Sequence, residues 1–169
     1  MKSEDLSAKG LGCPGWTPDG QHLVMPVRTN LFNAELYFIS DRGRSVKQIT
    51  HFDGLYRSTP FPYRVSLSPN SQWAIGWTIL NSPLKANLPE GPQLLLISTD
   101  GQIVKYLGDF GGTVIFPWSP DSRFVAASLI GPDSDPQTRA REINIIDVQT
   151  KEIKQITFDG STKDVFDWR

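Results

Sequence analysis

One phrase of nine residues occurs three times in the sequence, and no other feature restricts the possible folds as strongly. The copies begin at Trp16 (WTPDGQHLV), Leu67 (LSPNSQWAI) and Trp118 (WSPDSRFVA). Their prolines are spaced 51 residues apart, and a period of this length is typical of repeat architectures. Because one such unit cannot bury its own apolar face, we expect the units to pack on one another.

Each repeat reads as a set of short β-strands separated by polar turns. Runs rich in β-branched and aromatic residues occupy 36–39, 94–97 and 143–146. No window shows the roughly 3.6-residue apolar period of a helix, so helix content should be close to zero. The third repeat is expected to hold four strands, at about 113–118, 123–130, 143–148 and 153–158.

The Pro-Asp-Gly and Pro-Asn-Ser steps predict a chain reversal between the first two strands of each repeat. Proline presets φ at the first turn position, and the Asp or Asn side chain binds its own backbone. The bulky residue two positions before the proline is then placed to pack against the next sheet. Tryptophans predicted to fill the core between units are Trp16, Trp118 and Trp168. Trp73 and Trp77 alternate with Ile75 on a predicted strand, and this shared face should pack inward.

A second phrase closes each repeat. The segment 46–54 (VKQITHFDG) matches 153–160 (IKQITFDG), and 103–111 is a weaker middle copy. The core phrases recur, whereas the longer loops at 81–92 and 131–142 vary. Four-stranded antiparallel units of about 40–50 residues, each burying its face on the next, are the blades of a β-propeller.

Together, these phrases resemble the TolB-like β-propeller repeat, also described as the WD40-like Pro-Asp repeat, over about residues 12–169. The resemblance implies an all-β fold of three four-stranded antiparallel blades that follow a tail at 1–11. The blades would span about 12–62, 63–111 and 112–160. This repeat occurs in periplasmic scaffold proteins and in the propeller domains of prolyl-oligopeptidase-type serine peptidases, so the resemblance implies a fold more strongly than a function.

Three blades are fewer than a closed propeller needs, because such propellers have about four to eight. Residues 161–169 read as one extra strand, the innermost strand of a fourth unit. We therefore expect a partial propeller. It could be a fragment of a longer protein, half of a six-bladed homodimer, or a truncated copy that needs another partner.

Charge and composition exclude several classes of partner. Lys and Arg number 17 against 18 Asp and Glu, so the chain lacks the basic character of a nucleic-acid binder. No apolar run reaches the length of about 18 residues that a membrane span requires. The single cysteine, Cys13, excludes an internal disulfide and leaves the compartment open. As written the chain has no signal peptide, which suits the cytoplasm; removal of a signal would suit the periplasm.

The linkers that join successive blades are the expected binding surface, because each blade delivers one linker to the same axial funnel. Candidate ligand- or partner-binding residues are His51, Asp53, Tyr56, Arg57, Tyr63, Arg64, Asp109, Thr113, Asp159, Lys163 and Asp164. In an alternative interpretation, the three aspartates that stand beside or close to Gly54, Gly111 and Gly160 are ordinary turn residues.

Sequence motifs of catalysis are missing: there is no G-x-S-x-G, H-E-x-x-H, P-loop or paired C-x-x-C. We expect no cofactor and no metal. The leading hypothesis is a non-catalytic scaffold that binds a protein or peptide partner at the axial funnel and loop rim. The alternative is the propeller part of an enzyme. This could be the substrate-gating domain of a prolyl-oligopeptidase-type serine peptidase, or a propeller lyase or hydrolase that uses His51. The other histidine, His22, is predicted to be a packing residue.

Overall fold

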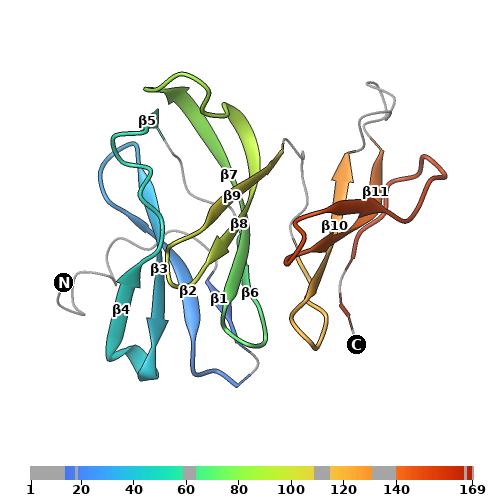
Figure 1. Ribbon diagram of the computed structural model, residues 1–169, viewed down its shortest axis with the longest axis horizontal. Helices are drawn as coiled ribbons and strands as arrows, with labels where there is room; N and C mark the ends of the chain where they lie inside the picture. The colour runs from blue at the N-terminus through green and yellow to red at the C-terminus, as the bar shows by residue number, and fades with distance from the viewer. Residues whose placement is uncertain are drawn as a thin grey trace. The chain divides into compact units, whose positions relative to one another are not determined.

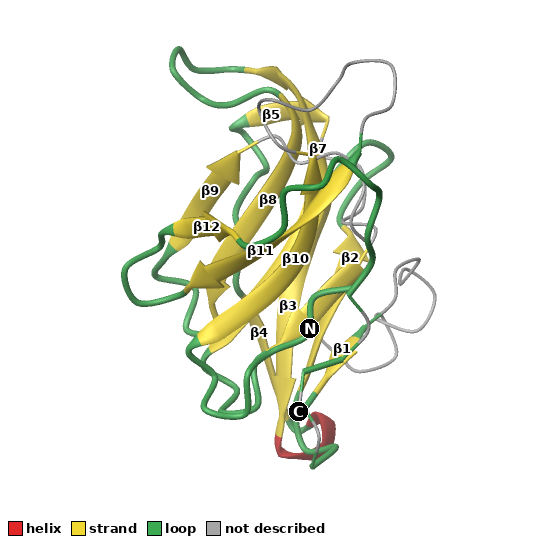
Figure 2. Cartoon of the chain, turned by 90° about the vertical axis from the view of Figure 1, so that its right-hand side faces the viewer, coloured by secondary structure: helices red, strands yellow, loops and turns green. Residues whose placement is uncertain are grey.

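The computed structural model describes residues 14–17, 19–58, 64–108, 115–130, 140–165 and 167–168. The chain divides into two compact units, Met1–Gly108 and Asp109–Arg169. Among the described residues the regular structure is all β, apart from one 3-10 turn, η2 (Asp41–Gly43) (Figure 2). The predicted all-β class is therefore confirmed, together with strands over 36–39, 94–97 and 143–146.

The first sheet of unit 1 has four antiparallel strands in the order β1-β2-β3-β4 (Figure 1). They are β1 (Gly15–Trp16), β2 (Leu23–Arg28), β3 (Ala34–Ser40) and β4 (Ser45–Gln48). Val24 pairs with Phe38 and Pro26 with Leu36, so these side chains share one face of the sheet. This face contributes to the core of unit 1.

The second sheet of unit 1 is also antiparallel and contains a short extra strand. It consists of β5 (Tyr56–Ser58), β6 (Arg64–Leu67), β7 (Trp73–Pro83), β8 (Gly91–Ser98) and β9 (Val104–Gly108). β5 pairs with the far end of β7, where Tyr56 lies opposite Pro83. On β7, Trp73, Ile75 and Trp77 share a face as predicted; Ile75 is fully buried and both tryptophans are half-buried.

A single apolar cluster joins the two sheets of unit 1. Val24, Leu36 and Ile49 come from the first sheet and the residue that follows it, and they pack with side chains of the second sheet such as Leu67 and Leu95. At the inner strands the backbones approach closely: a Cβ on Gly15 would stand 2.5 Å from the carbonyl oxygen of Val65. This contact explains why β1 begins with a glycine.

Unit 2 holds the third antiparallel sheet, of β10 (Phe124–Ile130), β11 (Arg141–Asp147) and β12 (Ile153–Gln155). The strands predicted at 123–130 and 143–148 are confirmed, and the one at 153–158 is shorter than expected. The strand predicted at 113–118 is present at its described positions only as an isolated bridge between Trp118 and Val125. Its first two residues lie outside the described part of the chain.

The extra strand expected at 161–169 is not formed at the positions described there, 161–165, 167 and 168. Instead, the Lys163 N–H donates to the Arg141 carbonyl (3.0 Å), and the Trp168 ring stacks on Phe124 (centroids 6.4 Å apart, 13° between planes).

Four tight turns share one hydrogen-bond pattern. Ser68 Oγ donates to Asn70 Oδ1 (2.8 Å) and accepts from the Trp73 N–H (3.0 Å), while Asn70 Oδ1 also accepts from the Gln72 N–H (3.0 Å). The same three bonds recur in the turns that begin at Thr17, Ser98 and Ser119. The residues after the Asp or Asn all have positive φ: Gly20, Ser71, Gly101 and Ser122. The predicted role of Asp and Asn in these turns is confirmed.

Trp16 is not the core residue that the repeat predicts. Its side chain is 56% exposed, whereas the equivalent Leu67 and Trp118 are 3% and 7% exposed. Trp16 belongs to an edge strand that pairs through two residues only, and a core position buries its side chain only where another element covers it. His22, by contrast, stacks on Phe38 (5.7 Å, 9°), which fits the predicted packing role.

Candidate functional site

Three segments of unit 1 meet at one end of its sheets and line an open pocket. β2 and β3 are joined by the turn 29–33, which therefore lies where β4 ends and the linker to β5 begins (Figure 1). Leu84, beyond the end of β7, reaches the same place, because its N–H donates to the Leu55 carbonyl (2.8 Å). The pocket, which we call the rim pocket, has a volume of about 470 Å³ and is lined by residues 30–33, 53, 54, 56, 57 and 84.

Large apolar side chains surround the rim pocket and are open to solvent. Leu31 is 81% exposed, Phe32 is 66% exposed and Leu84 is 49% exposed. Two hydrogen bonds hold the turn that presents the first two: Asn30 Oδ1 accepts from the N–H groups of Phe32 (2.8 Å) and Asn33 (2.9 Å). Sequence reasoning missed Leu31 and Phe32; two adjacent apolar residues between two asparagines, a residue type common in turns, were the available indication.

Three of the predicted site residues, Asp53, Tyr56 and Arg57, line the rim pocket. Asp53 Oδ1 accepts a long hydrogen bond from Asn33 Nδ2 (3.4 Å). Arg57 is exposed and forms no ion pair with any residue that the structure describes. The pocket thus offers one carboxylate and one guanidinium between apolar side chains.

Tyr56 contributes to the pocket wall but belongs mainly to the core. Its side chain is 1% exposed, and its hydroxyl forms no hydrogen bond with any residue that the structure describes. Burial raises the pKa of the Tyr56 phenol far above its usual value, and the neighbouring Tyr106 hydroxyl acts in the same direction. Tyr56 is therefore a neutral side chain that anchors β5.

A buried carboxylate ties the linker to the first sheet. Glu35, on β3, accepts from Thr50 Oγ1 (2.6 Å) and from the Asp53 N–H (2.8 Å). Thr50 Oγ1 in turn accepts from the Leu36 N–H (2.8 Å). Burial raises the pKa of Glu35, and the hydrogen bonds from Thr50 and the backbone oppose this effect. We call Glu35, Thr50 and Asp53 the carboxylate bridge; sequence reasoning missed Glu35.

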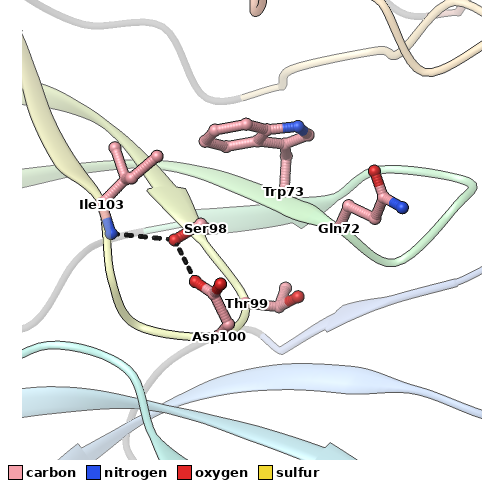
Figure 3. A pocket seen from close by; sticks show the side chains of 6 residues that line it. All are labelled: Gln72, Trp73, Ser98, Thr99, Asp100 and Ile103. Atoms are coloured by element: carbon pink, nitrogen blue, oxygen red, sulfur yellow. Dashed lines mark hydrogen bonds between the residues drawn. The ribbon is translucent and has the colours of Figure 1, made fainter.

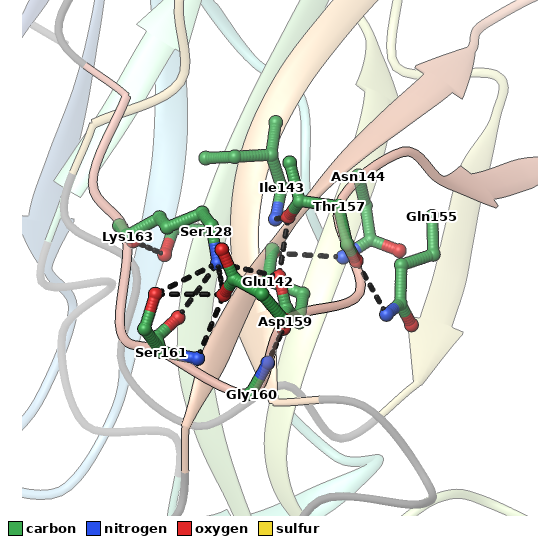
Figure 4. Close-up of polar contacts among 10 residues, drawn as sticks. All are labelled: Ser128, Glu142, Ile143, Asn144, Gln155, Thr157, Asp159, Gly160, Ser161 and Lys163. Carbon is green, nitrogen blue, oxygen red and sulfur yellow. Dashed lines mark hydrogen bonds and ion pairs between the residues drawn. The ribbon is translucent and has the colours of Figure 1, made fainter.

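Unit 2 contains the same arrangement with an added lysine (Figure 4). Glu142, on β11, accepts from Thr157 Oγ1 and from the Gly160 N–H (2.7 Å). Lys163 Nζ contacts Glu142 Oε2 (2.9 Å) and also pairs with Asp159. The hydrogen bonds from Thr157 and Lys163 lower the pKa of Glu142, and those from Lys163 and Ser161 lower the pKa of Asp159.

The remaining predicted site residues fall in different places. His51 Nδ1 lies 3.2 Å from Gln48 Nε2, and Arg64 lies in β6, opposite Trp77. In unit 2, Asp159 and Lys163 belong to the arrangement around Glu142, and Asp164 pairs with Arg141 (3.0 Å). Tyr63, Asp109 and Thr113 lie outside the described residues. The structure therefore brings together part of the predicted set, in unit 1, and gives a second part internal partners in unit 2.

A second pocket in unit 1 lies at a turn end of the second sheet (Figure 3). It has a volume of about 310 Å³ and lies between the turn at Ser98–Asp100 and the residues Gln72 and Trp73. Ser98 Oγ donates to Asp100 Oδ1 (2.5 Å) and accepts from the Ile103 N–H (2.9 Å). These contacts are the shared turn pattern, so they explain the pocket's polar groups without a ligand.

No group of three or more His, Cys, Asp or Glu side chains that could hold a metal ion is found in the part of the chain that the structure describes. Within the same residues, no helix has the length and apolar character needed to cross a membrane.

No family model matches the sequence, and no curated protein matches it. Solved structures do match. A TolB from Agrobacterium tumefaciens is 16% identical, with 92% of this chain and 49% of that chain covered and a TM-score of 0.58. TolB from Acinetobacter baumannii is 19% identical, with coverage of 89% and 33% and a TM-score of 0.58. A prolyl endopeptidase is 13% identical, with 90% of this chain and 23% of that chain covered and a TM-score of 0.61.

These likenesses concern the fold. The chain has a TolB-like β-propeller fold, as the repeated phrases predict, and its three antiparallel sheets correspond to propeller blades. It spans about half of the Agrobacterium protein and a third of the Acinetobacter protein. At identities this low, neither activity nor partners carry over.

Proposed function

We propose that this chain is a propeller scaffold that binds a peptide segment of a protein partner in the rim pocket of unit 1. The observation that carries the proposal is the convergence of Leu31, Phe32 and Leu84 on one pocket while all three remain at least 49% exposed. Single exposed apolar residues are common, but a contiguous group around a concave surface is typical of an interaction site.

The polar groups of the pocket suit a peptide. The Asp53 carboxylate can accept from a backbone N–H, and the Arg57 guanidinium can donate to a backbone carbonyl. An apolar side chain of the same peptide would then lie between Phe32 and Leu84. The walls are preorganised by the Asn30 turn and the carboxylate bridge, which lowers the entropy lost on binding.

A random peptide library displayed on phage tests the proposal. Peptides would be selected on the wild-type chain and their affinities measured for Phe32→Ser and for Phe158→Ser. Phe158 is 76% exposed and lies in unit 2, so it is the matched control for loss of an exposed phenylalanine. We expect Phe32→Ser to abolish binding and Phe158→Ser to preserve it. Failure to select any peptide, or equal binding by both variants, overturns the proposal.

Two earlier hypotheses stay predictions. The likeness to a prolyl endopeptidase extends to the fold only, so the enzyme alternative awaits a test such as loss of turnover in His51→Ala. The six-bladed homodimer likewise awaits a measurement of mass in solution.

A further inference from the structure

Only two carboxylates are buried among the residues that the structure describes. They are Glu35, which is 1% exposed, and Glu142, which is 4% exposed. Burying a carboxylate costs free energy unless hydrogen bonds or a cation compensate for it. Glu35 stands on β3 and Glu142 on β11. Each binds the chain that follows the next strand, β4 or β12.

In unit 1, the Glu35 carboxylate binds the linker at the point where one wall of the rim pocket begins. Glu35 Oε1 holds the Asp53 N–H at 2.8 Å, and Asp53 and Gly54 line the pocket. Leu55 then carries the hydrogen bond that brings Leu84 to the rim. One buried side chain is thus connected, through three consecutive linker residues, to both sides of the pocket.

The two carboxylates differ in how their charge is compensated. Lys163 Nζ lies 2.9 Å from Glu142 Oε2, whereas no Lys or Arg among the described residues pairs with Glu35. The Glu35 charge is balanced by hydrogen-bond donors of the linker itself, the Thr50 hydroxyl and the Asp53 N–H. Holding the linker in this conformation is therefore what compensates for burial of Glu35.

We propose that Glu35 is the positioning residue of the rim pocket, acting on a ligand through Asp53 and the linker rather than by contact. This inference rests on the proposed function, because it assigns Glu35 a role in peptide binding. It predicts that loss of the Glu35 charge loosens the linker while the sheets of unit 1 stay intact.

The test uses the whole chain and begins with three variants. Glu35→Gln removes the charge, Thr50→Val removes one donor at nearly constant shape, and Glu142→Gln is the matched control in unit 2. NMR hydrogen exchange of the Asp53 amide is measured first, since it requires no ligand. We expect the exchange rate of the Asp53 amide to rise about tenfold or more in Glu35→Gln. A hydrogen bond to a charged group contributes at least the free energy that corresponds to a tenfold change in an equilibrium constant. The exchange rate of the Val24 amide in β2 should not change in Glu35→Gln. The exchange rate of the Asp53 amide should not change in the Glu142→Gln control.

Affinity for a peptide selected on the wild-type chain is measured next. We expect about a tenfold loss in Glu35→Gln, a similar loss in Thr50→Val, and none in Glu142→Gln. Ile97→Ala opens a cavity in the core at a β8 residue that belongs neither to the linker nor to the pocket lining. It should bind normally while folded, so a merely structural role is distinguished. An unchanged exchange rate of the Asp53 amide in Glu35→Gln overturns the inference. If Glu35→Gln does not fold, the same measurement on Thr50→Val decides. Normal affinity of Glu35→Gln also overturns it, yet leaves the proposed function intact if Phe32→Ser still abolishes binding.

Discussion

Ile49 and Ile156 occupy the same register position in two different sheets, yet one is fully buried and the other is 48% exposed. The Ile49 N–H donates to the Leu36 carbonyl and the Ile156 N–H to the Ile143 carbonyl, both at 2.8 Å. In unit 1 the second sheet covers this position: a Cβ on Gly101 would stand 3.3 Å from the Ile49 Cα. The repeat therefore presents an isoleucine at this position that a neighbouring sheet can cover, as happens for Ile49.

Truncation of these two isoleucines should have unequal effects on stability. Ile49→Ala should lower the free energy of unfolding of unit 1 by about 2–5 kcal/mol, the usual cost of a cavity at a buried isoleucine. Ile156→Ala should change the stability of unit 2 by less than about 1 kcal/mol, because solvent already reaches the side chain. Urea denaturation monitored by NMR signals of each unit measures both. Equal losses would mean that Ile156 is covered in solution.

The homodimer, one of the three interpretations of the blade count, can be tested at Ile156. On the homodimer interpretation, sedimentation equilibrium at micromolar concentration should give twice the chain mass of 18.9 kDa, and Ile156→Glu should shift the equilibrium toward the monomer. Lys154→Glu, at an exposed neighbouring position of β12, serves as the control for added negative charge. A folded wild-type chain that sediments as a monomer contradicts the homodimer.

The pKa values of the two buried carboxylates should be shifted in opposite directions from the usual glutamate value of 4.5. Burial raises the pKa of Glu35, so its ionisation reduces stability as the pH rises from 4.5 through the raised value. Hydrogen bonds from Thr157 and Lys163 lower the pKa of Glu142, so its contribution is present above 4.5 and is lost as the pH falls through the lowered value. NMR titration of the carboxyl carbons should give a higher midpoint for Glu35 than for Glu142.

A lysine variant provides the control for this titration. Lys163→Met removes the cation that contacts Glu142, so the Glu142 midpoint should move up toward the usual value while the Glu35 midpoint stays in place. Coincident midpoints in the wild-type chain would contradict the assignment of these pKa shifts.

The shared turn pattern predicts the outcome of hydroxyl removal. Ser68 is fully buried, and Ser68→Ala would leave the Trp73 N–H without its acceptor, so unit 1 should lose about 1 kcal/mol of stability. Ser68→Thr should be nearly neutral, because threonine makes the same bonds at Thr17. Thermal denaturation followed by circular dichroism compares them. Equal stability of the two variants would show that the hydroxyl contributes nothing.

Sequence reasoning located the strands at 36–39, 94–97, 123–130 and 143–148. It also located three of the four turns, since the phrase around Pro18, Pro69 and Pro120 carries local physical requirements. It missed Glu35 and Glu142 because each acts on a threonine 15 residues later in the chain, a pairing that becomes evident only once the strands are placed side by side. It also misaligned the linkers: the N–H bound by glutamate belongs to Asp53 in unit 1 but to Gly160 in unit 2.

Exposure was the least predictable property. Trp16 has the residue type of a core position, but whether a side chain is covered depends on neighbouring elements and not on its own repeat. The apolar residues Leu31 and Phe32 lie in a turn, where a rule that assigns apolar residues to the core gives the wrong answer. The rim pocket therefore became evident only from the packing of three separate segments.

The repeated turn also has a consequence for the order in which the chain folds. Its hydrogen bonds join residues no more than five positions apart, so closing it costs little chain entropy. Contacts between sheets, such as Gly15 with Val65, close much longer loops and form more slowly. The hairpins should therefore appear first as independent nuclei, and assembly of one sheet on another should limit the rate of folding.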